Sequence, residues 1–150
     1  MRQVADLPLW LGHVGDARDH ARLHDLGIVA VVDLADSESP VVHPRSFVTL
    51  RFPLLDGAGN PPGILRLAVR ATADLIRDRI PTLVHCSAGM SRTPALAAAA
   101  LAEALGIPCP LALRLVTRDG PVDITPALWA DLLGVLIPGP GPDISSVNLG

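Results

Sequence analysis

One short segment brings together residue types that could do chemistry. The stretch VHCSAGMSRTP, residues 84–94, has Cys86 at the end of an apolar run and, after five intervening residues, Arg92. A cysteine thiolate is a strong nucleophile, and an arginine side chain is a planar fork that can hold two oxygens of one anion. The segment therefore predicts a nucleophile placed in an anion-binding loop.

The backbone of this segment suits a tetrahedral anion such as phosphate. The amides of residues 87–92 can curl inward as a nest, and a helix that follows adds the positive end of its dipole. Gly89 permits a backbone conformation that is closed to other residues, and small neighbours let the loop close. Donors and positive charge also stabilise a thiolate, so we expect Cys86 to attack phosphorus.

The elements that must position this loop alternate between strands and helices. The continuous β-branched run at residues 28–34 is typical of a strand buried on both faces. The pattern predicts an α/β fold with a central, mostly parallel β-sheet flanked by helices on both faces. Strands are predicted at residues 8–12, 28–34, 47–54 and 82–86, and helices at residues 16–27, 64–79, 93–105, 110–118 and 125–136.

Two helix ends carry specific signals. Asp16 is predicted to cap the first helix, and Gly27 lies just past its end. Thr125 is predicted to cap the last helix, with Pro126 in its first turn. The expected buried side of the first helix consists of Ala17, Ala21, Leu23 and Leu26.

Composition limits the classes of protein to which the chain can belong. A length of 150 residues, of which 49% are hydrophobic, predicts one domain with a real core. The net charge of −3 predicts no general attraction to nucleic acid or membranes, and two cysteines make no disulfide framework. The absence of a signal peptide pattern indicates a cytoplasmic protein. The basic residues are all arginine, which indicates a GC-rich bacterial genome. We expect a catalytic domain at residues 1–137 and a flexible Pro/Gly-rich tail at residues 138–150.

The stretch HCSAGMSRT matches the HCxxGxxR[ST] signature of the cysteine-dependent protein tyrosine phosphatase superfamily. Around it, the chain resembles a dual-specificity phosphatase domain over about residues 7–135. LWLGHVGDARDHARLHDLGIVAVVDLA is similar to the opening strand, helix and strand of that family. FPLLDGAGNPPG is similar to its general-acid loop, and VTRDGPVDITPALWADLL to its last two helices.

The resemblance implies a two-step phosphoryl transfer without a cofactor or a metal. Cys86 would form a phosphocysteine intermediate, and Asp56 would protonate the leaving oxygen and then activate water. Thr93 would donate its hydroxyl to the Cys86 sulfur, and His85 would fix the loop backbone by a hydrogen bond. The implied phosphate-binding residues are Ser87, Ala88, Gly89, Met90, Ser91 and Arg92.

Other interpretations of the acidic and amide residues stay open. Asp56 precedes Gly57 and would also suit a simple turn. Asp33 and Asp36 are rival acids, although neither follows the strand that the acid of the resembled family follows. Asn60 could hold the acid loop or the substrate, although a role in a turn is favoured.

The remaining cysteine and histidines have weaker signals. Cys109 is expected to pack, although a reversible disulfide with Cys86 is an alternative. The histidines show no metal-ligand spacing with carboxylates, and the two that lie one helical turn apart are expected on a solvated face. These histidines are His13, His20, His24 and His43.

The predicted substrate is a phosphomonoester, and among phosphomonoesters the prediction favours phosphotyrosine, phosphoserine/threonine or both on a protein. An inositol-phosphate or other small-molecule phosphatase of the same superfamily is the alternative, although the neutral loop favours a singly phosphorylated group. Arg45 or Arg51 could still make the pocket more basic. A third alternative, from a different class, is a binding module for phosphorylated residues that lacks activity. The sequence makes no prediction of the oligomeric state.

Overall fold

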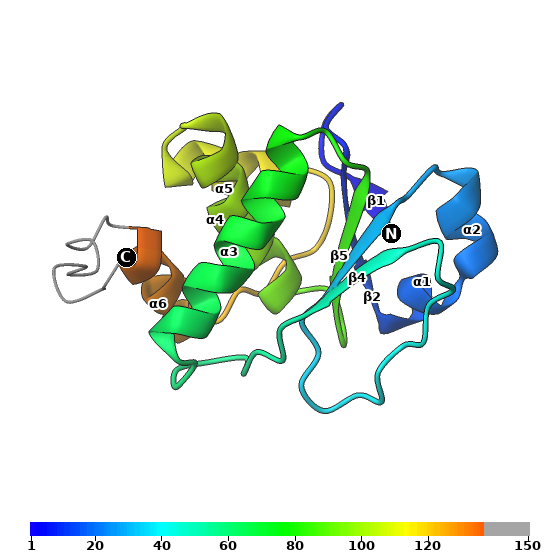
Figure 1. The fold of residues 1–150 in the computed structure, drawn as a ribbon. Helices are drawn as coiled ribbons and strands as arrows, with labels where there is room; N and C mark the ends of the chain where they lie inside the picture. Colours follow the sequence, from blue (N-terminus) through cyan, green and yellow to red (C-terminus); the bar gives the residue numbers. More distant parts are fainter. Residues whose placement is uncertain (137–150) are drawn as a thin grey trace, which may run out of the picture.

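A five-stranded sheet with the order β1-β2-β5-β3-β4 forms the centre of the molecule (Figure 1). The computed structural model describes residues 1–136. Only β1, which the sequence did not predict, is antiparallel to its neighbour; the other strand pairs are parallel. The predicted mostly parallel sheet is therefore confirmed. The strands are β1 (Arg2–Gln3), β2 (Leu9–His13), β3 (Ala30–Asp33), β4 (Val48–Arg51) and β5 (Thr82–Cys86).

Helices cover both faces of the sheet, as predicted (Figure 1). Four helices lie on one face, and two short ones lie on the other. On the first face are α3 (Pro62–Arg77), α4 (Arg92–Leu105), α5 (Cys109–Thr117) and α6 (Pro126–Leu136); on the second are α1 (Val14–Arg18) and α2 (His20–Asp25).

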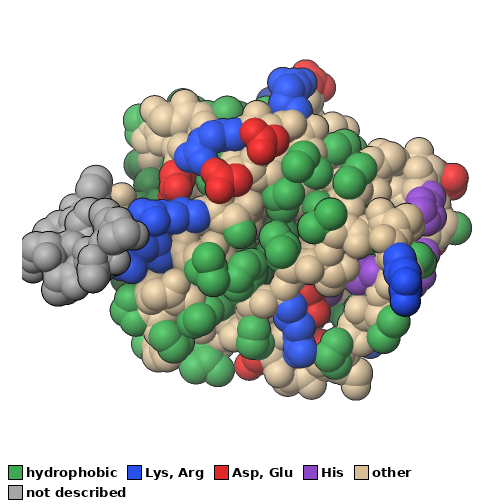
Figure 2. All heavy atoms as spheres, in the orientation of Figure 1, with side chains coloured by type: hydrophobic (Ala, Val, Ile, Leu, Met, Phe, Trp, Pro, Cys, Tyr) green, Lys and Arg blue, Asp and Glu red, His purple; other side chains and the backbone are tan. Residues whose placement is uncertain are grey.

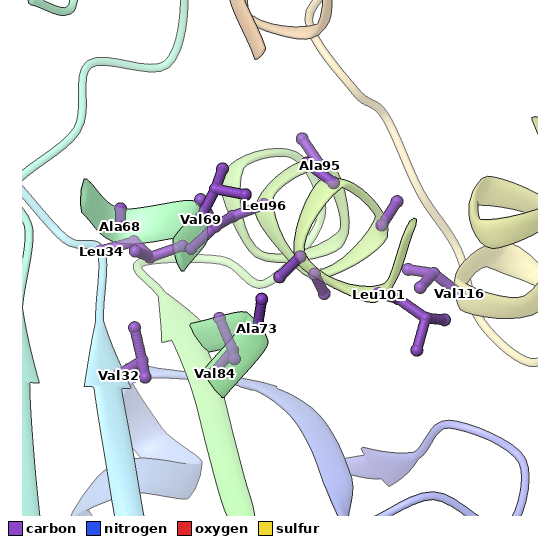
Figure 3. Packing of buried hydrophobic residues seen from close by; sticks show 14 of the residues in the cluster. Val32, Leu34, Ala68, Val69, Ala73, Val84, Ala95, Leu96, Leu101 and Val116 are labelled. Atoms are coloured by element: carbon purple, nitrogen blue, oxygen red, sulfur yellow. The ribbon is translucent and has the colours of Figure 1, made fainter. Parts of the chain in front are cut away.

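The central strands are buried on both faces because their side chains alternate between two hydrophobic clusters. Val32 of β3 and Val84 of β5 lie in the large cluster beneath α3 and α4 (Figure 3). Their neighbours Val31 and Leu83 lie in the smaller cluster beneath α1 and α2. This burial on both faces explains why the sequences of these strands are continuous apolar runs.

Helix α4 is buried almost throughout, and its composition explains how. Residues 92–102 are all buried, and most of them are alanine. Small side chains let α3, α5 and α6 approach α4 closely while the sheet covers its remaining side. Gly106, at a φ of 63°, ends the helix in the left-handed conformation. This buried helix fixes the position of the loop that precedes it.

The first predicted helix is instead two short helices, and the predicted cap at Asp16 is wrong. His13 caps α1 through Nδ1, and Asp16 lies in the first turn, where it completes a capping box with the His13 N–H. Asp19 then caps α2 by accepting from the Arg22 N–H at 3.1 Å. The break at Asp19 changes the buried side: Ala17 and Leu23 are buried, whereas Ala21 and Leu26 are exposed.

Three histidines gather around Phe47 on the α2 side of the molecule, where Figure 2 shows histidine side chains at the surface. The ring centroids of His20 and His43 lie 5.2 Å apart, and those of His24 and Phe47 lie 4.7 Å apart. Neither ring nitrogen of His43 has a hydrogen-bond partner in the described part of the chain. The predicted solvated face is therefore wrong for His20, which is half-buried against His43.

The C-terminal end of the chain is described only in part. Helix α6 begins at Pro126, and the Trp129 N–H donates to the Thr125 carbonyl, as expected for a helix that starts there. The predicted tail, residues 138–150, and the predicted domain boundary at residue 137 lie outside the described residues. Within residues 1–136, no helix combines the length and the apolar character needed to cross a membrane.

Candidate active site

A pocket of about 190 Å³ lies where β5 ends and α4 begins. Cys86 is the last residue of β5, and Arg92 is the first residue of α4. The structure thus brings the predicted nucleophile and the predicted anion clamp to one cavity. The lining residues are Asp56, Cys86, Ala88, Met90, Ser91, Arg92 and Asp123.

Cys86 lies at the base of this pocket and is only 2% exposed. The Gly89 N–H donates to its Sγ at 3.2 Å, and such a donor favours a negatively charged sulfur. Gly89 has a φ of 77°, and a Cβ there would approach the Gly12 carbonyl oxygen to 2.7 Å. Glycine at position 89 is therefore required twice over, by its conformation and by its close approach to β2.

Arg92 is held by three neighbours, and its Nε has no partner among the described residues. Its Nη1 donates to the Asp36 carboxylate at 2.5 Å and to the Leu54 carbonyl at 3.0 Å. Its Nη2 donates to the Ser87 hydroxyl at 3.0 Å. Its Nε is buried and has no hydrogen-bond partner within residues 1–136. The guanidinium is thus fixed in place through Nη1 and Nη2, and Arg92 as a whole lines the pocket.

The carboxylate of Asp36 stays charged beside this guanidinium. Desolvation acts to raise the pKa of Asp36, but the hydrogen bond from Arg92, backbone N–H donors and the positive charge of Arg92 outweigh it and hold the pKa below its ordinary value. Asp36 had been considered as a rival general acid. An ionised carboxylate that is paired with Arg92 is unsuited to that role, so we assign Asp36 to positioning Arg92.

Asp56 reaches the pocket from the loop that follows β4. Its Oδ1 accepts a hydrogen bond from the Ser91 hydroxyl at 2.5 Å and another from the Thr125 hydroxyl at 2.9 Å. These bonds join the loop of Asp56 to the start of α6 and to the predicted anion-binding loop, residues 86–92, which we call the phosphate loop. The structure therefore brings Asp56 together with Cys86 and Arg92, as the sequence predicted.

Asn60 holds the loop of Asp56 in shape. The side chain is 6% exposed and makes three hydrogen bonds: from the Leu55 N–H at 2.8 Å, to the Leu55 carbonyl at 3.0 Å and to the Gly57 carbonyl at 3.3 Å. The turn and the support of the acid loop, two of the roles predicted for Asn60, are thus the same interaction, and Asn60 is not among the residues that line the pocket. The amide fixes the backbone on both sides of Asp56.

The contact predicted for Thr93 differs from the one in the structure. Its hydroxyl donates to the Gly12 carbonyl oxygen at 3.4 Å rather than to the Cys86 sulfur. A carbonyl oxygen is a better acceptor than a thiol sulfur, and β2 brings the Gly12 carbonyl next to the start of α4. In this arrangement Thr93 ties the phosphate-loop helix to β2.

His85 lies behind the phosphate loop, fully buried, with its Nε2 3.7 Å from the Asp33 Oδ1. Burial lowers the pKa of His85, while Asp33 and the backbone of Cys86 partly offset this effect, so the ring is neutral near pH 7. Neither ring nitrogen makes a hydrogen bond of good geometry within the described residues. The predicted bond from His85 to the loop backbone therefore does not reach good hydrogen-bond geometry, although the backbone of Cys86 lies close enough to act on the pKa of His85.

The remaining residues considered from the sequence lie away from the pocket. Asp33 is buried, accepts from the Ala35 N–H at 2.9 Å and lies 3.6 Å from the Arg51 Nε, so it is a structural carboxylate. Neither Arg51 nor Arg45 lines the pocket, so the suggestion that they make it more basic is wrong. Cys109 is a free thiol packed against the main core, as predicted.

Sequence reasoning missed one residue that lines the pocket, Asp123. It lies in the loop between α5 and α6, and its N–H donates to the Met90 carbonyl at 2.8 Å. Nothing in the local stretch PVDIT marks this residue, because the loop has no periodic pattern and lies 31 positions from Arg92 in the sequence.

The comparison of this chain with known proteins rests on solved structures, because no family model and no curated protein sequence matches it. Human DUSP28 is 24% identical with a TM-score of 0.80, and the match covers 91% of this chain and 95% of that one. A mouse putative dual specificity phosphatase, solved in complex with zinc tungstate, is 25% identical with a TM-score of 0.78, over 89% and 84% of the two chains. The human tyrosine phosphatase-like serine/threonine/tyrosine-interacting protein is 19% identical with a TM-score of 0.76, over 89% and 93%. These matches span nearly the whole of each chain.

Proposed function

We propose that this chain, whose fold is that of the dual-specificity phosphatases of the cysteine-dependent protein tyrosine phosphatase superfamily, hydrolyses phosphomonoesters through a phosphocysteine intermediate at Cys86. One observation carries the proposal. The sulfur of Cys86 lies at the base of a pocket that is also lined by Arg92, whose Nε is buried and unpartnered. A buried donor without a partner is costly, and a phosphate oxygen in the pocket would satisfy it.

In the first step, the Cys86 thiolate attacks phosphorus and forms a sulfur–phosphorus bond as the bond to the leaving oxygen breaks. Arg92 and the amides at the start of α4 stabilise the charge on the oxygens that remain on phosphorus. Asp56, in its protonated form, gives its proton to the leaving oxygen. Its position in the pocket lining supports this role.

In the second step, water attacks phosphorus and the sulfur–phosphorus bond breaks. Asp56, now ionised, takes a proton from the attacking water, and inorganic phosphate leaves with the thiolate regenerated. The hydrogen bonds from Ser91 and Thr125 to Asp56 support this proposal because they keep the carboxylate next to the phosphate loop. Each step uses only side chains and backbone amides of this chain together with water, with no metal or cofactor.

The substrate that we propose carries a single phosphoryl group at the site of attack, as a phosphorylated tyrosine, serine or threonine does. Among the described residues that line the pocket, Arg92 is the only basic one, and it is already paired with Asp36. Inositol polyphosphates present several anionic groups together and need several cations. This lining therefore favours a singly phosphorylated substrate over an inositol polyphosphate.

The experiment that tests the proposal compares the wild type with Cys86→Ser on a panel of phosphopeptides, aryl phosphates, nucleotides and inositol phosphates. We expect the wild type to hydrolyse phosphopeptides, and the variant to lose turnover while it still binds tungstate, a tetrahedral oxyanion found in the mouse structure. A serine hydroxyl is scarcely ionised near neutral pH, which explains the loss. Substantial activity in Cys86→Ser would overturn the covalent mechanism. Binding of phosphopeptides without turnover by the wild type would instead identify a binding module.

A further inference from the structure

Asp123 is held rigidly at the mouth of the phosphate pocket. Two hydrogen bonds fix its loop to the phosphate loop: the Asp123 N–H donates to the Met90 carbonyl at 2.8 Å, and the Thr125 N–H donates to the Ser91 hydroxyl at 3.1 Å. The carboxylate itself forms no hydrogen bond or ion pair with any residue in the range 1–136. Asp123 therefore presents a fixed, unpaired negative charge at the entrance.

This charge opposes binding of a phosphate dianion. Asp123 lines the pocket without a partner, whereas Arg92, the only cation among the described lining residues, already has Asp36 as a partner. Like charges a few ångströms apart repel, and the repulsion is not offset by any other cation in the lining. The repulsion weakens binding unless the substrate itself brings a positive charge to the rim.

The size of the pocket determines where such a charge would lie. At about 190 Å³, the pocket accommodates a phosphoryl group, and the atoms that follow it emerge at the rim. Asp123 and Met90 lie at this rim, and both are exposed. A side chain next to the phosphorylated residue would thus meet a carboxylate and a thioether rather than a basic surface.

We propose that Asp123 determines specificity by selecting phosphopeptides with an arginine or lysine next to the phosphorylated residue and by disfavouring those with acidic neighbours. This inference rests on the proposed phosphatase function and names its substrate class. Asp123 acts on binding of the flanking residue and takes no proton in the reaction.

The test uses three phosphopeptides that differ only in the residue beside the phosphorylated one, which is Arg, Gln or Glu. For the wild type we expect kcat/KM to be about 3- to 20-fold higher with the Arg peptide than with the Glu peptide. Arg is attracted to Asp123 and Glu is repelled by it, so the difference between the two peptides is about twice the small effect of one exposed ion pair. Asp123→Asn should bring this ratio close to one, mainly through KM. Asp123→Arg should reverse the preference. The wild-type ratio should also shrink as ionic strength rises from about 0.05 M to about 0.5 M.

Asp119→Asn is the matched control, because Asp119 lies in the same loop, is exposed and is not among the pocket-lining residues. It should keep the wild-type ratio. A wild-type ratio near one, or a ratio that survives Asp123→Asn and Asp123→Arg, would overturn the inference. An aryl phosphate whose ring carries no charge, assayed in parallel, separates the two proposals. If the wild type hydrolyses this compound but shows no charge preference among the peptides, only the role of Asp123 fails. If the wild type hydrolyses no substrate at all, the phosphatase function itself fails.

Discussion

Arg92 and Asp36, which lie 56 positions apart in the sequence, form an ion pair of 2.5 Å that joins the phosphate loop to the segment after β3. Only the arginine side of the pair is shielded: the Arg92 side chain is 9% exposed, whereas that of Asp36 is 31% exposed. Together with the Leu54 carbonyl, Asp36 occupies Nη1 of Arg92, which leaves Nε for an anion. The geometry of the anion clamp therefore depends on a carboxylate outside the phosphate loop.

Replacing this carboxylate should disturb the clamp. Asp36→Asn keeps the shape of the side chain but removes its charge, so we expect kcat/KM to fall by about 10- to 100-fold, since a clamp displaced by about 1 Å can cost that much. The deficit should be the same for good and poor leaving groups, because the oxygens on phosphorus need the clamp in every case. Steady-state kinetics with a series of aryl phosphates measures this. Asp25→Asn, at the exposed end of α2, is the control. An unchanged kcat/KM in Asp36→Asn would show that Asp36 does not position Arg92.

Asp56→Asn should give the opposite pattern across leaving groups. We expect kcat to fall by about 10²- to 10⁴-fold for alkyl and phenyl phosphates, the usual effect of a positioned proton donor. The deficit should shrink steeply for a highly activated aryl phosphate, which leaves almost unaided. The same aryl phosphate series measures the effect. A uniform deficit would mean that Asp56 only shapes its loop, and that the acid lies elsewhere.

Asn60→Ala should loosen the loop of Asp56. The substitution removes three hydrogen bonds and leaves the Leu55 N–H and carbonyl without the partner they have now. We expect unfolding to become easier by about 1–3 kcal/mol, the cost of an unsatisfied buried polar group, with kcat reduced more for poor than for activated leaving groups. Denaturant unfolding and leaving-group kinetics measure the two effects. A loss of stability with unchanged kinetics would limit Asn60 to a structural turn.

The histidine cluster predicts how stability depends on pH. Burial, helped by the nearby His20 and His85, lowers the pKa of His43, and Asp33 acts weakly in the other direction. The unfolded chain therefore binds a proton at His43 at a higher pH than the folded chain does, so stability falls as the pH drops below about 6.5. His43→Phe, next to Phe47, should reduce the difference in Tm between about pH 7.5 and about pH 5.5. An equal difference in the variant and the wild type would show that His43 does not contribute.

The sequence predicted the elements whose signal is local. The apolar runs of β3 and β5 and the alanine-rich α4 form as expected, and solved structures confirm the predicted resemblance to dual-specificity phosphatases. Cys86 and Arg92 were also predictable, because a single contiguous segment contains both.

The contacts between distant segments could not be predicted in the same way. The pairing of Arg92 with Asp36 and the position of Asp123 depend on how loops far apart in the sequence pack together. The cap at Asp16 was wrong for a related reason: His13 ends β2 and caps α1 at once, and no helix propensity describes such a junction.

The covalent intermediate on Cys86 is the most direct test of the account. In Asp56→Asn, an activated aryl phosphate should still phosphorylate Cys86, while attack of water on the intermediate is slowed because its base is missing. Acid quenching during turnover, followed by mass spectrometry of the digested protein, should find one phosphoryl group on the peptide that contains Cys86. If the wild type turns over the substrate but Asp56→Asn carries no phosphoryl group on this peptide, or carries the group on another residue, the mechanism is contradicted.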